Sequence, residues 1–293
     1  MPLKWSSFKE LSVPRFTPAD FCETLDGGQS FRWDKSGNFS DTEPEYVGVF
    51  GKTAAILKLS KNGTVFCSHL KNAPDTVEKA EEYLDAKRDY GKIRKSLFES
   101  KDSVMRKALE IYPTLRLLRQ SPAEALMCFI CSSSKRIVQI KQCVKLLSEN
   151  LGEEICDGMF SLPTFDKIAD ADIKTIRECK LGFRADYLKK SAIKIRGDAF
   201  DPNNLRAAPY GEAKKYLVSL SGIGEKVADC ILLFGAAKME AFPVDTWIRQ
   251  AMSELYGTPD NPDKIREFAK SKFGENAGFA QQLIFAAKRK NLL

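Results

Sequence analysis

A lysine and a carboxylate follow a glycine-rich turn in the C-terminal third of the chain. Lys226 lies two residues after Gly224 in Leu-Ser-Gly-Ile-Gly-Glu-Lys, and Asp245 follows a Pro-Val pair further along. The pattern predicts two helices joined by a tight glycine hairpin over residues 211–235, and a third helix that begins at Asp245. Gly222 and Gly224 can adopt positive φ and let a phosphate approach the backbone N–H groups. A lysine held beside that phosphate could attack a sugar carbon once its amine is neutral.

Each of these features also has a purely structural interpretation. The glycines could simply join two packed helices, Lys226 could be a solvated helix lysine, and Asp245 could be an ordinary helix N-cap. A helix N-terminus also keeps a carboxylate ionised, which an enzyme needs in order to stabilise a sugar oxocarbenium ion. Because the structural explanations are independent and the three features coincide at this spacing, the combination favours a catalytic pair.

The hairpin offers acceptors as well as donors. The backbone carbonyls of Val218, Leu220 and Ile223 could hold a monovalent cation, K⁺ or Na⁺. Such an ion would add positive charge facing a bound phosphate.

Composition limits the function classes. The 293 residues allow one large domain or two smaller ones, and 43% hydrophobic with 29% charged residues is typical of a globular protein. The net charge of +7 permits a polyanionic partner without requiring one. With His69 as the single histidine, Ser-His-Asp catalysis and His-rich metal sites are poor candidates.

The cysteines and the apolar runs indicate the compartment. Eight cysteines at irregular spacing, without an N-terminal apolar run, argue against a secreted disulfide framework. No stretch approaches the roughly 20 apolar residues of a membrane span. We therefore expect an intracellular protein, in the cytoplasm or nucleoid of a prokaryote or in the nucleus of a eukaryote.

The hydrophobic pattern changes along the chain. Short strand-like runs occupy residues 29–70, with an Asn-Gly hairpin signal at 62–63, and helical patterns dominate from residue 76. We expect an α+β fold, with an antiparallel sheet domain and helical bridge over residues 1–105 and a mostly helical body over 106–293.

Two helices of that body have clear signals. Ser121-Pro122-Ala-Glu124 is typical of a capping box with proline at the first helical position. The sequence pattern over residues 277–289 predicts a further helix, the last one of the body.

Five motifs, in order along nearly the whole chain, resemble the 8-oxoguanine DNA glycosylase family, and residues 217–249 resemble its superfamily of helix-hairpin-helix Gly/Pro-Asp DNA glycosylases. The motifs are Gly-Gln-Ser-Phe-Arg-Trp at 28–33, Phe-Ile-Cys-Ser-Ser at 129–133, Leu-Gly-Phe-Arg-Ala at 181–185, Lys-Val-Ala-Asp-Cys at 226–230 and Ala-Gly-Phe-Ala-Gln at 277–281.

The resemblance implies an enzyme that flips 8-oxoguanine out of duplex DNA and excises it. Lys226 would attack C1′ and form a Schiff base, and Asp245 would stabilise the developing positive charge and orient the lysine. Because the imine acidifies the C2′ proton, β-elimination would follow and nick the strand.

The resemblance also implies the residues of the base pocket. The carbonyl of Gly28 would accept the N7 hydrogen that 8-oxoguanine has and guanine lacks. Gln281 would bond the Watson–Crick edge, Phe285 and Cys230 would sandwich the flipped base, and Phe129 would line the pocket. Double-stranded DNA would be the partner of a monomer, with phosphate contacts at Gly222 and Gly224.

Several expected DNA contacts depart from the eukaryotic pattern. Ser134, Gln139 and Arg184 stand where those members use an asparagine and two arginines to hold the cytosine opposite the lesion. Phe183 stands in place of a wedge tyrosine and Trp247 in place of a histidine near a phosphate. The departures predict a prokaryotic-type member with weaker preference for cytosine. Lys288, in place of an aspartate at the pocket edge, is a further departure.

The resemblance implies no organic cofactor. The last cysteine, Cys230, precedes the place of the C-terminal four-cysteine iron–sulfur cluster that some related glycosylases carry, so we expect no cluster. Cys128-x-x-Cys131 lacks a second pair at zinc-ligand spacing. The alternatives are a related glycosylase for another damaged base, such as an alkylated one, and a non-catalytic helix-hairpin-helix DNA-binding protein.

Overall fold

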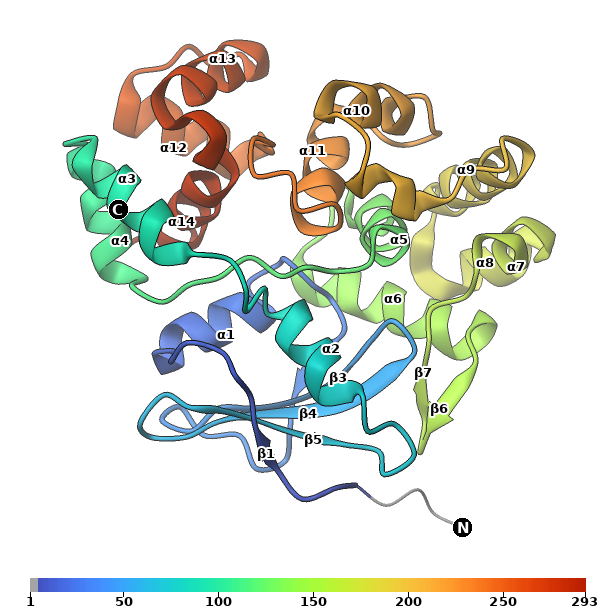
Figure 1. Cartoon of the computed structure of the whole chain (residues 1–293). Helices are drawn as coiled ribbons and strands as arrows, with labels where there is room; N and C mark the ends of the chain where they lie inside the picture. Colours follow the sequence, from blue (N-terminus) through green and yellow to red (C-terminus); the bar gives the residue numbers. More distant parts are fainter. Residues whose placement is uncertain (1–4) are drawn as a thin grey trace.

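The computed structural model describes residues 5–293 and places an antiparallel sheet at one end of a larger helical body (Figure 1). The sheet has the strand order β1-β5-β4-β3-β2, and each neighbouring pair is antiparallel. Its strands are β1 (Lys9–Glu10), β2 (Trp33–Lys35), β3 (Glu45–Phe50), β4 (Thr53–Leu59) and β5 (Val65–His69). This architecture confirms the predicted α+β class.

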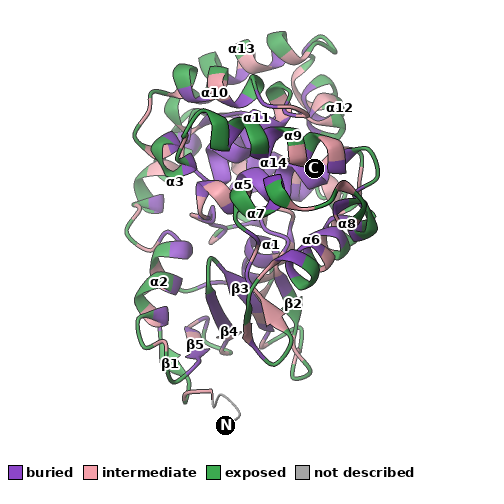
Figure 2. Ribbon diagram, turned by 90° about the vertical axis from the view of Figure 1, so that its right-hand side faces the viewer, coloured by how far each residue is buried: buried purple, intermediate pink, exposed green. Residues whose placement is uncertain are grey.

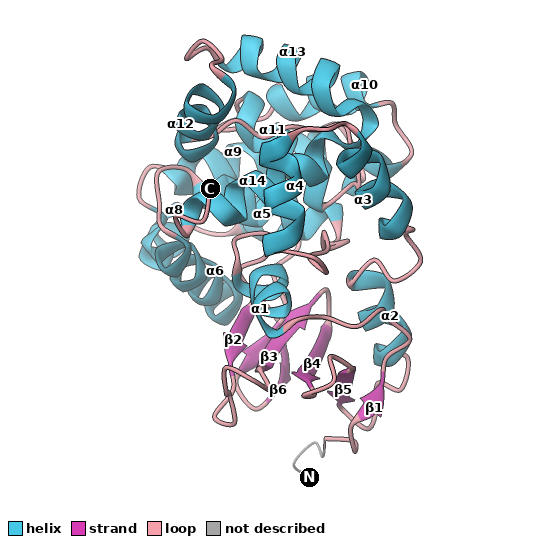
Figure 3. Cartoon of the chain, turned by 90° about the vertical axis from the view of Figure 1, so that its left-hand side faces the viewer, coloured by secondary structure: helices cyan, strands magenta, loops and turns pink. Residues whose placement is uncertain are grey.

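Helix α1 (Pro18–Asp26), which the sequence analysis did not predict, lies between the sheet and the helical body (Figure 3). Its start has a clear local cause. The Thr17 hydroxyl caps it by accepting from the Asp20 N–H at 3.1 Å, and proline occupies its first position. Phe21 and Leu25 are fully buried in the core that α1 forms with the sheet.

The sheet differs from its prediction at one edge. The run 30–33 enters a strand only at Trp33, because the chain before it turns toward the helical body. There the Phe31 ring meets Phe129 edge-on, with ring centroids 5.5 Å apart. The Asn-Gly hairpin is confirmed between β4 and β5, where Gly63 has φ +85°.

Helices of the body carry most of the remaining chain, together with one small two-stranded hairpin. The helices of the body are α3 (Tyr90–Glu99), α4 (Ser103–Ile111), α5 (Pro122–Ser132), α6 (Ile137–Leu151), α7 (Phe165–Asp170), α8 (Ile173–Ile176), α9 (Arg184–Gly197), α10 (Tyr210–Val218), α11 (Glu225–Phe234), α12 (Thr246–Tyr256), α13 (Pro262–Phe273) and α14 (Ala277–Arg289), and the hairpin is β6 (Glu154–Cys156) with β7 (Met159–Phe160). Helix α2 (Thr76–Tyr83) packs instead on the sheet, where Ala80 and Tyr83 belong to the core that the sheet forms with α1. Shorter helical turns span η1 (Arg177–Leu181), η2 (Pro202–Arg206) and η3 (Gly274–Asn276).

The centre of the body consists of α5, α11 and α14, which are buried along most of their length, whereas α13 lies at the exposed rim (Figure 2). α14 approaches the loop before α12 closely: the Gly278 N–H donates to the Met239 carbonyl at 2.7 Å, and a Cβ at Gly278 would collide with the Leu233 side chain. These helices therefore form a fixed frame for side chains at their ends.

The body extends toward the sheet domain through α3. Tyr90 and Leu97 of this helix are buried in the core of the helical body. The domain division at residue 105 stays a prediction, and residues 1–4 of its first part lie outside the described residues. Within residues 5–293, no helix is both long and apolar enough to cross a membrane.

The predicted capping box at α5 is wrong in its side chains. The helix begins at Pro122 as expected, but the Ser121 side chain makes no cap hydrogen bond. The Glu124 carboxylate instead accepts from the Gly51 N–H at 2.8 Å and pairs with Arg32 at 3.4 Å, both side chains being 5% exposed. A tertiary contact has thus taken the acceptor that a local cap would use.

Substituting Glu124 with alanine should destabilise the fold strongly, since it leaves the buried Arg32 guanidinium without its carboxylate partner. We expect a loss of about 3–5 kcal/mol in the free energy of unfolding, measured by urea denaturation. Glu153→Ala is the matched control, because its pair with Lys52 is exposed and should contribute less than about 1 kcal/mol. Equal losses in the two variants would contradict this interpretation.

Candidate active site

The glycine hairpin between α10 and α11 exposes backbone donors. Gly222 has φ +79°, and a Cβ there would lie 2.5 Å from the Tyr187 ring. The N–H groups of Gly222 and Gly224 donate to no group within residues 5–293, and no side chain caps α11. Unpaired N–H groups at the start of a ten-residue helix are suited to a phosphate.

Some of the backbone carbonyls of the hairpin accept no backbone hydrogen bond in the described part of the chain. The Val218 and Ile223 carbonyls accept no backbone hydrogen bond in the described part of the chain, whereas the Leu220 carbonyl accepts from the Ile223 N–H at 3.3 Å. The Ser221 carbonyl accepts from the Ser191 hydroxyl at 2.9 Å. Two free carbonyls on one turn fit the oxygen donors that K⁺ or Na⁺ requires.

A buried polar network fixes the two hairpin helices against each other. The Tyr210 hydroxyl donates to Asp229 at 2.6 Å, and Lys214 lies 3.0 Å from the same carboxylate and 2.6 Å from Glu225. Burial raises the pKa of Asp229, while Lys214 and the Tyr210 hydroxyl oppose that shift. The network therefore ties α10 to α11 immediately behind the hairpin.

A cavity of about 560 Å³ opens beside the hairpin, and most of the predicted pocket residues meet there. Such a volume is ordinary for a small-molecule site. Lys226 and Asp245 line it together, although they come from different helices. The other predicted residues in its wall are Gly28, Phe129, Cys230, Trp247, Gln281 and Phe285.

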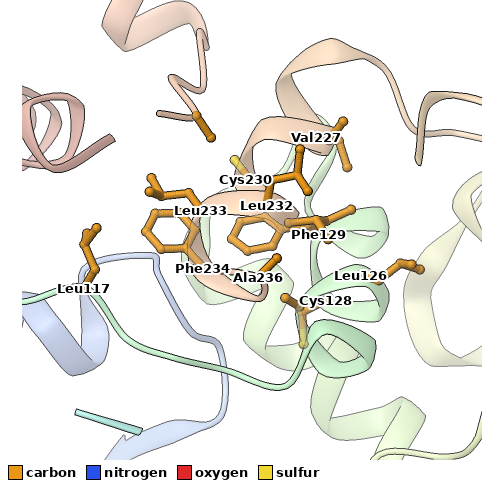
Figure 4. Packing of buried hydrophobic residues seen from close by; sticks show 14 of the residues in the cluster. Leu117, Leu126, Cys128, Phe129, Val227, Cys230, Leu232, Leu233, Phe234 and Ala236 are labelled. Atoms are coloured by element: carbon orange, nitrogen blue, oxygen red, sulfur yellow. The ribbon is translucent and has the colours of Figure 1, made fainter. Parts of the chain in front are cut away.

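The floor of the cavity is apolar. Phe129 of α5 and Phe234 of α11 stack with centroids 5.6 Å apart, and Cys230 lies one turn before Phe234 (Figure 4). Burial raises the pKa of the Cys230 thiol to about 11, although the nearby Lys226 ammonium opposes the shift. The thiol is therefore neutral at physiological pH and offers a flat, polarisable surface rather than a competing nucleophile.

Asp245 caps α12, as predicted. Its carboxylate accepts from the Ile248 N–H at 2.8 Å, so one oxygen is fixed by the helix. This cap does not argue against a chemical role, because the same carboxylate lines the cavity with Lys226. The cap therefore fixes the position of a carboxylate in the same cavity as the lysine.

Gln281 of α14 has one end of its amide fixed and the other free. Its Nε2 donates to the Pro243 carbonyl at 3.2 Å, and its buried Oε1 has no partner within residues 5–293. An oriented acceptor in a cavity wall is suited to an N–H edge of a planar base.

The predicted contacts to the opposite base lie outside this cavity. Phe183 is 56% exposed and follows a turn in which Lys180 and Gly182 have positive φ. Ser134 and Gln139 are exposed near the start of α6. All three stand on a surface beside the cavity rather than in it.

Arg184 has a different environment from the one expected of a DNA contact. It is 6% exposed, and its Nε and Nη2 donate to the Ser133 carbonyl, the former at 2.6 Å. Its guanidinium also lies over the Phe183 ring, 4.2 Å from the centroid. In this arrangement Arg184 supports the Phe183 turn through part of its donor set, and its role as a DNA contact stays a prediction.

Lys288 also differs from the residue it replaces. Its ammonium pairs with Glu254 of α12, and it does not line the cavity. Cys128 and Cys131 are buried in the core of the helical body. Among the described residues, no group of three or more His, Cys, Asp or Glu side chains could hold a metal ion.

The sequence analysis missed several cavity residues. Lys135, Arg136 and Ile137 reach it from the turn before α6, and Gln282 and Arg289 reach it from α14. The last two could have been found, because they lie three residues before and four residues after Phe285 and so share its helix face.

Two family models match adjoining parts of the chain. One is described as 8-oxoguanine DNA glycosylase, N-terminal domain, and matches residues 15–126. The other is described as HhH-GPD superfamily base excision DNA repair protein and matches residues 127–275.

Relatives and solved structures agree with these matches. The N-glycosylase/DNA lyase OGG1 of Arabidopsis thaliana is 30% identical over 307 residues, covering 97% of this chain and 80% of the relative. The Clostridium acetobutylicum 8-oxoguanine glycosylase/lyase, in complex with double-stranded DNA containing cytosine opposite 8-oxoG, has a TM-score of 0.84 at 33% identity and covers 100% of both chains. A 3-methyladenine DNA glycosylase from Archaeoglobus fulgidus, at 19% identity and a TM-score of 0.74 over 98% of this chain and 100% of that chain, shares the fold alone.

The N-terminal match is specific to one branch of the superfamily, and it covers the segment that carries Gly28. The family expected from the five motifs is thus confirmed: the chain belongs to the 8-oxoguanine DNA glycosylase family.

Proposed function

We propose that this protein excises 8-oxoguanine from duplex DNA through an imine formed by Lys226 and then nicks the strand by β-elimination. The observation that carries the proposal is the meeting of Lys226 and Asp245 in one cavity, with Lys226 only two residues after Gly224, whose N–H has no partner among the described residues. Membership of the family makes the chain a bifunctional DNA glycosylase with lyase activity. The roles of Lys226, Asp245 and the residues around the base are proposed here.

The chemistry follows from what each group can do. The hairpin N–H groups bind a backbone phosphate and thereby place the adjacent sugar beside α11. The neutral Lys226 amine attacks C1′, and the bond from C1′ to the base breaks as the base leaves with the electron pair and gains a proton. The ionised Asp245 stabilises the positive charge that develops on the sugar.

The second step uses the imine. Opening of the sugar ring leaves an imine between Lys226 and C1′, which acidifies the proton on C2′. Loss of that proton and departure of the 3′ phosphate oxygen complete the β-elimination. No redox change is involved, so the side chains of the cavity are sufficient.

The base pocket supports 8-oxoguanine as the substrate. The carbonyl of Gly28 would accept the N7 hydrogen of the lesion, and Gln281 would accept from its N–H edge through the free Oε1. Cys230 and Phe285 would enclose the ring with Phe129 at the pocket floor. Flipping costs a few kcal/mol of unstacking, which these contacts must offset.

The hairpin carbonyls of Val218, Leu220 and Ile223 would hold K⁺ or Na⁺ and add positive charge next to the phosphate. Two of the three carbonyls are free of backbone hydrogen bonds in the described residues, which supports this assignment. We further propose that the protein acts as a monomer on double-stranded DNA.

The Lys226→Gln variant should lose excision by at least about a thousandfold, because the glutamine amide is not a nucleophile that can form an imine. In a single-turnover assay, borohydride, which reduces an imine to a stable amine, should trap the wild-type protein covalently on 8-oxoguanine duplexes. It should not trap the Lys226→Gln variant. Lys95→Gln, at an exposed lysine of α3, is the control and should behave as wild type. Trapping that persists in Lys226→Gln would refute the assignment.

Asp245→Asn separates the cap from the charge, because asparagine caps a helix about as well as aspartate. The melting temperature should change little, while excision should fall by roughly 10²–10³. The single-turnover rate and a thermal melt measure the two effects. If excision and melting temperature both stay at their wild-type values, Asp245 is a cap and nothing more.

Excision opposite cytosine and opposite adenine should proceed at similar rates, within about tenfold. Bidentate arginine readout of a base is worth roughly 1–3 kcal/mol, and here Ser134 and Gln139 are not arginines while Arg184 is bonded to the Ser133 carbonyl. Single-turnover rates on the two duplexes test this. A strong preference for cytosine would show that Arg184 leaves its backbone partner on binding DNA.

A further inference from the structure

Two polar side chains of α14 line the active-site cavity without a complete set of partners. Both Gln282 and Arg289 belong to its wall. The Nε2 atom of Gln282 and the Nε atom of Arg289 are buried, and neither has a hydrogen-bond partner within residues 5–293. A buried donor without an acceptor is costly, so such a donor calls for an acceptor that the protein itself does not provide.

The two side chains share a helix face with the expected stacking residue. Gln282, Phe285 and Arg289 are separated by three and four residues, the spacing that aligns side chains along one side of an α-helix. The face of α14 that lines the cavity therefore presents an aromatic ring flanked by two donors. The Arg289 guanidinium lies 5.8 Å from the centroid of the Phe285 ring.

Arg289 is held in place by a buried carboxylate of α1. Its Nη2 donates to both oxygens of Glu23, at 2.9 and 2.8 Å, and the Glu23 side chain is 1% exposed. Lys290 approaches the same carboxylate at 3.2 Å but does not line the cavity. Glu23 occupies the last turns of α1, which leads directly to Gly28, and a Cβ on the intervening Gly27 would collide with it.

The ion pair thus connects Arg289 in the cavity wall to α1, the helix that leads to Gly28 in the same cavity. Because Glu23 uses only Nη2, the other nitrogens of the Arg289 guanidinium keep their donor capacity. An arginine fixed in this way has little rotational freedom to lose when it binds a further acceptor.

We propose that Gln282 and Arg289 donate hydrogen bonds to the carbonyl oxygens of the flipped base, and that Glu23 is the positioning residue that orients Arg289. This inference rests on the proposed excision of 8-oxoguanine, whose purine ring carries acceptor oxygens at C6 and C8. Gln281 offers its free acceptor to the N–H groups of that base, so its neighbour Gln282 and Arg289 complement it with donors.

The experiment compares Arg289→Met with Lys290→Met, a matched pair because both cations contact Glu23 and only Arg289 lines the cavity. Gln282→Leu removes the second donor at similar volume. Each variant is measured for single-turnover excision of 8-oxoguanine, for affinity to a duplex with a tetrahydrofuran abasic analogue, and for melting temperature. The abasic analogue has no base, so its affinity reports the hairpin and the DNA backbone alone.

Arg289→Met and Gln282→Leu should each slow excision about tenfold or more, with unchanged affinity for the abasic duplex. Lys290→Met should stay within about twofold of wild type, since it keeps the Arg289 pair. Glu23→Gln should slow excision less than Arg289→Met does, because a neutral amide still offers one acceptor to Arg289.

Two results would overturn the inference. Equal slowing in Arg289→Met and Lys290→Met would mean that Arg289 only neutralises Glu23, and wild-type rates in both Arg289→Met and Gln282→Leu would mean that neither donor reaches the base. If Arg289→Met fails to fold, Arg289→Lys keeps the charge for Glu23 but lacks Nε, and its rate decides the question. Failure of the wild-type protein to excise 8-oxoguanine would instead refute the proposed function.

Discussion

The position of α11 is the constraint on which the rest of the site depends. This helix begins directly after the hairpin, so its first turn carries Lys226 only two residues after the hairpin glycine Gly224. Its second half is buried against α5, where Phe234 stacks on Phe129, and its side chain Leu233 meets α14 at Gly278. A helix packed on several sides cannot slide, and a side chain in its first turn inherits that rigidity.

The polar groups around α11 also hold this helix in place, through hydrogen bonds and an ion pair instead of apolar packing. Asp229 is fully buried, and its raised pKa reflects the cost of holding a carboxylate away from water. Tyr210 and Lys214 of α10 compensate by donating to it, which fixes the angle between the two hairpin helices. Removing one partner would leave a buried charge unpaired, so this network tolerates little rearrangement.

Sequence reasoning succeeded where the cause of a structure is local. The glycine hairpin, the Asp245 cap and the span of α14 depend on residues within a few positions of one another, and the structure has all three. It failed where a distant partner decides the outcome. Glu124 contacts Gly51 instead of capping α5, because the Gly51 N–H, in the turn between β3 and β4, donates to its carboxylate.

The same limit applies to the site. The pocket residues that a family motif names were found, whereas Arg289 depends on Glu23, 266 positions away in the chain. Arg184 shows a similar dependence: the resemblance implies a DNA contact for it, which stays a prediction, and in the structure its Nε donates to the Ser133 carbonyl. Side-chain type alone does not reveal which donors a folded protein has already used.

The residues expected to contact the opposite base have a different environment from those that line the cavity. The cavity is lined mainly by α5, α6, α11 and α14 together with Gly28, and several of its residues belong to the core of the body. Ser134 and Phe183 lie in exposed turns and Gln139 is exposed in the first turn of α6, where substitution costs little stability. The two groups of residues are nonetheless connected by a hydrogen bond, because the Gln139 side chain accepts from the Arg136 N–H and Arg136 lines the cavity. A substitution at position 139 can therefore disturb the cavity wall through the turn before α6.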